Sequence, residues 1–221
     1  MALAAYKLLD NRTSYAVWKI EETAEELYKQ LQLKEHEIDY LEKLNNGKRS
    51  LHWLSTRVLL RKMLNTREYI DCRIDEHGKP YLVNFPHHIS LSHSYDYAAV
   101  IISEDKPVGI DIELIKNKIE RVAKKFLNDA ELSYIDLSNP IEHLYVCWCA
   151  KEAVYKLHGK NNISFLADIR LEAFNYHNIG QFRVSLNTKT GYSNFEVHYE
   201  KFKNYMIGYV YGGTNDLSNE E

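Results

Sequence analysis

Cysteine is scarce in this chain of 221 residues, which contains only Cys72, Cys147 and Cys149. Three thiols do not make a disulfide framework, and such a pattern is typical of a reducing compartment. Cys147 and Cys149 lie two positions apart in an expected helix and point to different sides of it, which argues against joint metal ligation. We therefore expect a cytoplasmic protein.

A long apolar run is also missing, because no stretch reaches the ~18 residues that a membrane-spanning helix requires. Residues 1–10 are too short and too interrupted to be a signal peptide. The net charge of −3 gives no general attraction for nucleic acid. The sequence thus predicts no membrane partner and no nucleic-acid partner, and a magnesium-dependent nuclease is the weaker interpretation.

The remaining composition suits a folded core. Apolar residues make up 45% and charged residues 27% of the chain, enough for one compact unit or two small halves. Apolar periodicity, capping boxes and turns predict helices near 24–31, 34–44, 49–64, 119–126, after Asn128 and at 140–158, with strands near 14–20, 70–74, 81–83, 97–102, 108–113, 181–186, 194–200 and 205–211. We expect Asn45-Asn46 to break a helix and residues 214–221 to form a frayed tail. This order of elements favours an α+β fold.

The expected helix from Pro140 to His158 has proline in its first turn and Gly159 just past its end. Ser138 or Asn139 can cap its start. One face of the helix is apolar in its first half and carries charged residues in its second half. The residues of this face are Ile141, Leu144, Tyr145, Trp148, Glu152, Tyr155 and Lys156. A solvated Glu–Lys pair is the simple explanation, whereas a buried pair would need a partner or a metal.

A second pair of carboxylates lies in the expected strand Val108–Glu113. Apolar residues alternate there with Gly109, Asp111 and Glu113, which predicts a half-buried strand with both carboxylates on one face, about 7 Å apart. An acidic outer face of an edge strand is one explanation. A bound divalent cation is the other, and Mg²⁺ prefers such oxygen ligands.

Together, Gly109-Ile-Asp-Ile-Glu113 and Trp148-Cys-Ala-Lys-Glu-Ala-Val-Tyr-Lys156 resemble the paired signature of the 4′-phosphopantetheinyl transferase superfamily. The chain length resembles its larger, monomeric, surfactin-synthetase-activating type. The resemblance implies two similar halves related by a pseudo-twofold, each an antiparallel sheet packed with helices, with the active site in the cleft between them. The halves would be residues 1–107 and 108–221, although we find no sequence repeat that supports this division.

The resemblance also implies an activity. Such an enzyme transfers 4′-phosphopantetheine from coenzyme A to a serine of an apo acyl or peptidyl carrier protein, releases 3′,5′-ADP and requires Mg²⁺. Asp111, Glu113 and Glu152 match the family's metal ligands, and Glu152 also matches its leading candidate for the base. Lys156 would bind the diphosphate, while Lys151 would reach phosphate or form a salt bridge. The absence of nucleophile-elbow, Walker A and dinucleotide motifs is consistent with a nucleophile that comes from the partner.

Other positions are expected to bind coenzyme A. Gly78-Lys79-Pro80 matches a family motif whose lysine approaches the nucleotide phosphates, and Ser92-His93-Ser94 matches one whose histidine acts at the diphosphate. Alone, these would be a hairpin turn and a serine-rich turn. Arg49 and Arg57, on the basic helix 49–64, are the candidates for the 3′-phosphate, unless that face is only solvated.

A basic face near residues 116–125 is a candidate docking surface, since acyl carrier proteins present an acidic helix beside the acceptor serine. Its members are Lys116, Lys118, Arg121, Lys124 and Lys125. An ordinary charged helix face is the alternative. The rival to the whole interpretation is a non-catalytic module that binds coenzyme A or a carrier protein, for which Glu152 would be dispensable.

Overall fold

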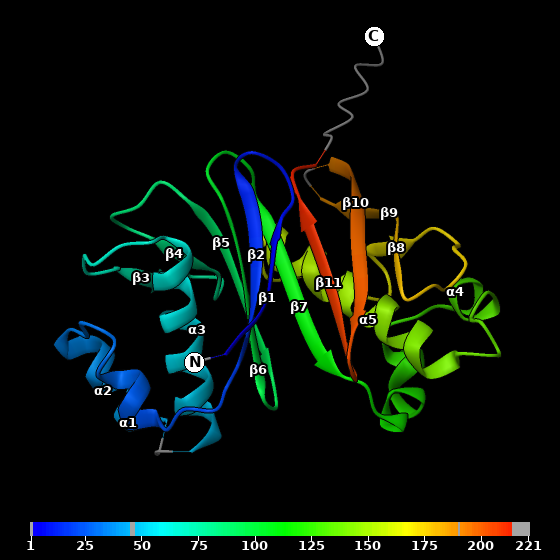
Figure 1. Ribbon diagram of the computed structural model, residues 1–221. Helices are drawn as coiled ribbons and strands as arrows, with labels where there is room; N and C mark the ends of the chain where they lie inside the picture. Colours follow the sequence, from blue (N-terminus) through cyan, green and yellow to red (C-terminus); the bar gives the residue numbers. More distant parts are fainter. Residues whose placement is uncertain (1, 45–46, 190, 214–221) are drawn as a thin grey trace, which may run out of the picture.

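The computed structural model describes residues 2–44, 47–189 and 191–213, and two antiparallel sheets stand side by side at its centre (Figure 1). The first sheet has the order β1-β2-β6-β5, with β1 Ala2–Leu8, β2 Thr13–Lys19, β5 His88–Ser94 and β6 Tyr97–Ser103. The second has the order β7-β11-β10-β9-β8, with β7 Val108–Leu114, β8 Ile169–Leu171, β9 Ile179–Thr188, β10 Gly191–Phe202 and β11 Tyr205–Tyr211. A small hairpin pairs β3 Cys72–Ile74 with β4 Pro80–Leu82.

Helices cover the outer faces of both sheets (Figure 1). Beside the first sheet lie α1 Ala24–Tyr28, α2 Glu35–Lys43 and α3 Lys48–Met63. Beside the second lie the 3₁₀ helix η1 Asn117–Lys125, α4 Asp129–Ser133 and α5 Pro140–His158. The predicted α+β class is therefore confirmed. None of the described helices is both long and apolar enough to cross a bilayer.

The two sheets share a core, which β7 helps to form. Val108, Ile110 and Ile112 pack against apolar residues of β2, β6 and β11. The opposite face of β7 lies against α5, because Gly109 meets the backbone of Ala153. The prediction of a half-buried strand was therefore wrong, since β7 is covered on both faces and Asp111 is only 4% exposed.

The order of connections is alike in the two sheets. In the first, β2 pairs with the later strand β6, and β6 pairs with β5. In the second, β7 pairs with the last strand β11, and β11 pairs with β10. This likeness is compatible with a pseudo-twofold relation, and the division of the chain at residue 108 stays a prediction.

Helix α5 has the predicted bounds. Gly159 ends it with φ 70°, a left-handed conformation that glycine adopts without a steric penalty. Asn139 precedes it but forms no side-chain cap, because its amide donates to Asp136 instead. The helix is buried on most sides rather than along one stripe, since it lies between the sheet and the segment 163–171.

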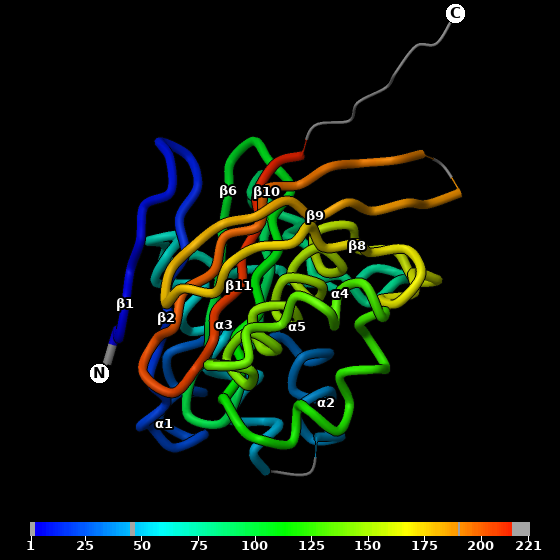
Figure 2. The backbone as a smooth tube through the Cα atoms, turned by 90° about the vertical axis from the view of Figure 1, so that its right-hand side faces the viewer, coloured from blue at the N-terminus to red at the C-terminus, as the bar shows by residue number. Residues whose placement is uncertain are grey.

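The structure confirms some of the remaining predictions of helices and strands and contradicts others. The capping boxes of Thr23 with Glu26 and of Asn128 with Glu131 are present. The expected α-helix near 119–126 is the 3₁₀ helix η1 instead. Strand β1, which the sequence did not predict, forms the outer edge of the first sheet (Figure 2). The expected helix break at Asn45-Asn46 and the tail 214–221 lie outside the described residues.

Candidate active site

A row of serine hydroxyls joins the two sheets at the candidate site. Strands β5 and β7 belong to different sheets, so their backbones share no ladder. Instead, the backbone amides of alternate β7 residues donate to serines of β5: Ile110 to Ser90 at 3.1 Å, Ile112 to Ser92 at 3.3 Å and Leu114 to Ser94 at 3.1 Å. We call Ser90, Ser92 and Ser94 the serine ladder. Because their side chains recur every second residue, all three face β7.

The serine ladder also orients the two carboxylates of β7. The Ser92 hydroxyl donates to Asp111 Oδ1 at 2.8 Å, and the Ser94 hydroxyl donates to Glu113 Oε2 at 2.9 Å. Each hydroxyl has one proton, so both protons are committed to a carboxylate while the oxygens accept from β7. The first half of the chain therefore fixes the acidic strand of the second.

Lys156 reaches this cluster from α5. Its Nζ donates to Asp111 Oδ1 at 2.7 Å, to Ser92 Oγ at 3.0 Å and to the Ile110 carbonyl at 3.1 Å. Burial disfavours the ammonium, but the charges of Asp111 and Glu152 outweigh that effect and raise the pKa of Lys156. Lys156 is thus a fixed cation on the acidic strand.

Glu152 lies one helical turn before Lys156 and is half-buried. Burial and then the charges of Asp111 and Glu113 raise its pKa to about 7, against the opposing effect of Lys156. Burial and Asp111 also raise the pKa of Glu113. The charge of Asp111 thus disfavours the charged forms of both glutamates, which is the condition that a bound cation relieves.

The chemistry of these donors suits Mg²⁺. Asp111 Oδ2 is buried and has no hydrogen-bond partner among the described residues. Across residues 2–44, 47–189 and 191–213, however, no three His, Cys, Asp or Glu side chains are grouped closely enough to hold a metal ion by themselves. Mg²⁺ commonly takes only one or two carboxylates and completes its shell with water and substrate phosphates. One or two of the carboxylates, completed by water and substrate phosphates, would fit that mode, and the assignment of Asp111, Glu113 and Glu152 as ligands stays a prediction.

A cationic cavity of about 360 Å³ opens beside the cluster and is lined in part by Arg49, Trp53, Arg57 and His93. The Arg57 guanidinium lies 4.3 Å from the Trp53 ring and donates to Thr56 Oγ1 at 3.1 Å. Its Nε is buried without a partner among the described residues, and burial lowers its pKa. A buried guanidinium without a carboxylate is suited to an anionic ligand.

His93 lines this cavity and lies near Lys156 and Asp111. Its ring stacks on His52 at a centroid distance of 4.3 Å. Reduced hydration, His52 and Lys156 lower the pKa of His93 to about 4, so the imidazole is neutral at pH 7. A neutral imidazole can donate one hydrogen bond to a phosphate oxygen.

Lys79 lies at the other side of Lys156, and both line a second cavity of about 170 Å³. The Lys79 ammonium donates to the Leu157 carbonyl near the end of α5. Gly159 leaves room for this lysine, because a Cβ there would lie 2.2 Å from Lys79 Cδ. The structure thus brings Lys79, Lys156, Ser92 and the acidic strand to one region.

Lys151 does not join them. It is fully buried on the far side of α5, where its Nζ donates to Glu131 Oε2 at 2.9 Å and to the carbonyls of Phe165 at 2.8 Å and Ile169 at 2.9 Å. All three ammonium protons are used, so none is left for a phosphate. We therefore withdraw Lys151 from the coenzyme A ligands and retain the salt-bridge alternative.

The sequence did not single out Ser90 or His52. The signal for Ser90 was present, because serine recurs at every second position through Ser94. His52 belongs to the predicted basic helix, but its contacts with Tyr95 and His93 could not be predicted, because those residues come from another part of the chain.

The fold and site define an α+β protein with a cluster of acidic side chains around Lys156 and a cationic cavity, a combination suited to a phosphorylated ligand. Residues 107–210, which are just under half of the chain, match the model of the 4′-phosphopantetheinyl transferase superfamily.

Relatives of known name support the assignment. A 4′-phosphopantetheinyl transferase of Bacillus subtilis is 34% identical over 91 residues, which cover 39% of this chain and 40% of the relative. The 4′-phosphopantetheinyl transferase Sfp of Bacillus subtilis strain 168 is 28% identical over 140 residues, 58% of this chain and 60% of Sfp. The 4′-phosphopantetheinyl transferase AcpT of Escherichia coli K12 is 30% identical over 124 residues, 53% of this chain and 63% of AcpT. The chain thus matches about half the length of these relatives.

Proposed function

We propose that the protein transfers the 4′-phosphopantetheine group of coenzyme A to a serine of an apo acyl or peptidyl carrier protein. The observation that carries this proposal is the meeting of Asp111 and Glu113 with Glu152 and Lys156, near Arg57, whose buried Nε has no hydrogen-bond partner among the described residues. The names of the relatives point to the same reaction.

In this reaction the serine oxygen of the carrier attacks the β-phosphorus of coenzyme A. A new oxygen–phosphorus bond forms, the bond to the bridging oxygen breaks, and 3′,5′-ADP leaves. When bound to Asp111, Glu113 and Glu152, Mg²⁺ would neutralise charge on the diphosphate. Glu152, which matches the family's leading candidate for the base, would take the serine proton.

The remaining side chains would hold coenzyme A. Arg49 and Arg57 would bind the 3′-phosphate in the larger cavity, where Arg57 Nε has no other partner among the described residues. His93 and Ser92 would contact the diphosphate beside Lys156, and Lys79 would approach it from the smaller cavity. We further propose a monomer that works in the cytoplasm, in keeping with its three free, buried thiols.

The test is intact-mass analysis of an apo acyl carrier protein after incubation with the protein, coenzyme A and Mg²⁺. We expect a gain of one phosphopantetheine that EDTA abolishes. Glu152→Gln keeps the shape of the side chain but removes the base and the charge, so we expect its rate to fall by about 100-fold or more. Glu172→Gln, an exposed change elsewhere, should retain the wild-type rate.

Calorimetric titration with coenzyme A separates this function from its rival. A protein that binds coenzyme A but modifies none of several unrelated apo carriers would be the binding module. Glu152→Gln that modifies the carrier at the wild-type rate would remove Glu152 from the proposed mechanism.

A further inference from the structure

His52, on α3, contacts two points of the hairpin that β5 and β6 form. Its ring stacks on that of His93 in β5, with a centroid distance of 4.3 Å and an interplanar angle of 20°. Its Nε2 lies 2.7 Å from the carbonyl oxygen of Tyr95, in the turn that follows β5. A carbonyl oxygen can only accept, so Nε2 of His52 carries the proton of this hydrogen bond. One imidazole of α3 therefore contacts both the end of β5 and the turn.

The ring of His93 has little else to fix it. Its side chain is exposed and lines the larger cavity beside Arg49 and Arg57. In the part of the chain that the structure describes, only His52 stacks on this ring, and the ring forms no hydrogen bond with another residue. An unrestrained imidazole rotates about two side-chain bonds, and a ligand that needs one orientation bears the cost of fixing it.

The backbone of the turn is strained at the residue that His52 contacts. Tyr95 has a φ of 50°, in the left-handed region that tyrosine rarely adopts. Such a conformation persists where the surrounding contacts fix it, and it is concentrated at functional sites. The hydrogen bond from His52 to the Tyr95 carbonyl is one of these contacts. This bond fixes the His52 ring in turn, so the ring is a rigid support for His93.

We propose that His52 is a positioning residue, which holds the imidazole of His93 in the orientation that meets a phosphate oxygen of coenzyme A. The inference rests on the proposed function, because it assumes that His93 contacts the diphosphate. His52 is not one of the residues that line the larger cavity, so it acts through His93. The ligand then meets a hydrogen-bond donor that is already oriented, which lowers the cost of binding.

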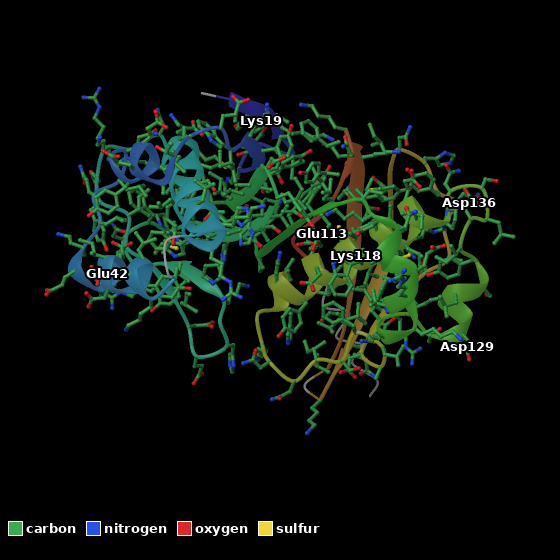
Figure 3. All side chains as sticks on the ribbon, turned by 90° about the horizontal axis from the view of Figure 1, so that it is seen from below. Lys19, Glu42, Glu113, Lys118, Asp129 and Asp136 are labelled. Carbon is green, nitrogen blue, oxygen red and sulfur yellow. The ribbon has the colours of Figure 1, made fainter. Side chains whose placement is uncertain are left out.

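A double-mutant cycle tests this role, with calorimetric titration of coenzyme A in the presence of Mg²⁺ as the measurement. We expect His52→Ala to weaken binding by about three- to tenfold. In the His93→Ala background the same change should alter the affinity by less than about twofold, since His52 then has no ring to orient. His36→Ala is the matched control, because His36 is exposed on α2. Figure 3 places Glu42 of this helix at the outer edge of the molecule, whereas Glu113 lies near its centre.

Two conservative variants separate the ring of His52 from its hydrogen bond. His52→Phe keeps a flat ring against His93 and should recover most of the lost affinity. His52→Gln keeps a donor for the Tyr95 carbonyl but has no ring, so it should bind coenzyme A as weakly as His52→Ala. Rescue by glutamine and not by phenylalanine would overturn the inference, because His52 would then act on the turn alone.

An unchanged affinity in His52→Ala, or an equal loss with and without His93, would also overturn the inference. A wild type that binds coenzyme A but modifies no carrier would refute the proposed function, and the cycle would still decide the role of His52. If the wild type does not bind coenzyme A, three-bond NMR couplings decide instead, since they report χ1 of His93 without a ligand. We expect one rotamer in the wild type and an average of several in His52→Ala. One shared rotamer in both proteins would exclude the positioning role.

Discussion

His143 shows how one buried side chain makes the stability of this fold depend on pH. The ring is fully buried on α5, and Nδ1 accepts from the Asp136 amide at 3.0 Å. Nε2 has no hydrogen-bond partner among the described residues, and Phe174 lies against the ring at 4.5 Å. Burial lowers the pKa of His143, and Asp136 opposes this only in part. The unfolded chain therefore binds a proton more readily than the folded one.

The expected consequence is a loss of stability in mild acid. Because the folded pKa of His143 is lowered, its effect is absent at pH 7.5 and grows as the pH falls through about 6.5, the ordinary value for histidine. Urea unfolding at pH 7.5 and 5.5 measures the change in the free energy of unfolding. His143→Asn keeps an acceptor near Nδ1 and cannot be protonated, so it should lose less stability than the wild type. Equal losses in the two proteins would contradict this role, with exposed His36→Asn as the control.

Residues of the site could be predicted from the sequence where their spacing within one strand or one helix already places their side chains close together. Asp111 and Glu113 share a face because strands have period two, and Glu152 lies near Lys156 because helices repeat at i,i+4. The bond between Lys156 and Asp111 was not predictable, since it depends on how α5 lies against β7. For the same reason the sequence could not decide whether Lys151 faces the ligand or Glu131.

At the scale of elements, the site depends on how closely α5 approaches β7. A Cβ on Gly109 would lie 1.9 Å from the Ala153 carbonyl oxygen, and a Cβ on Gly208 would lie 2.8 Å from the Cys149 carbonyl carbon. Both neighbours are backbone atoms of α5, which cannot rotate away. The glycine of the Gly-Ile-Asp-Ile-Glu motif therefore sets the distance across which Lys156 reaches Asp111.

Gly109→Ala should push the helix away from the strand. We expect a loss of about 1–3 kcal/mol in the free energy of unfolding, as for other overpacked cores, and a larger loss for Gly109→Val. The transfer rate should fall as well, because Lys156 and Glu152 move with the helix. Urea denaturation and the intact-mass assay measure the two effects. If Gly109→Val is as stable as the wild type, the helix and the sheet can separate without cost, and the expectation is wrong.

Elements were predictable where local signals mark their ends. Pro140 and Gly159 bound α5, and reciprocal capping boxes begin α1 and α4. The sequence did not predict β1, which pairs with β2 with a register shift between Leu3 and Ala5. The helix η1 was predicted from the spacing of Ile119, Ala123 and Phe126, but that spacing could not show that the backbone follows the tighter 3₁₀ path.

At the scale of the molecule, polar contacts tie the sheets together around their shared apolar core. Lys7 and Tyr15 of the first sheet bind Glu200 of the second, at 2.8 Å and 2.5 Å. On the opposite edge, the serine ladder accepts amides of β7. Such long-range pairings carry no local sequence signal, so the way the two sheets meet could not be predicted from composition or periodicity.

Ser90→Ala tests the ladder without touching a residue of the proposed machinery. The change leaves the Ile110 amide buried without its acceptor, which should cost about 1–3 kcal/mol of unfolding free energy. Ser50→Ala is the matched control, because the Ser50 hydroxyl is buried and has no partner among the described residues. Urea denaturation should therefore leave Ser50→Ala near the wild type. Equal stability of the two variants would mean that the ladder does not hold the sheets.

The edge position of β7 has a consequence for how the protein is made. Its sheet partner is β11, and residues 115–204 separate the two strands in the sequence. During synthesis on the ribosome, β7 cannot pair with β11 until that whole segment has been made. Strand β5 with its serines is synthesised before β7. We expect those hydroxyls to be the first partners of the nascent β7, and nascent chains halted before β11 to lack a formed site.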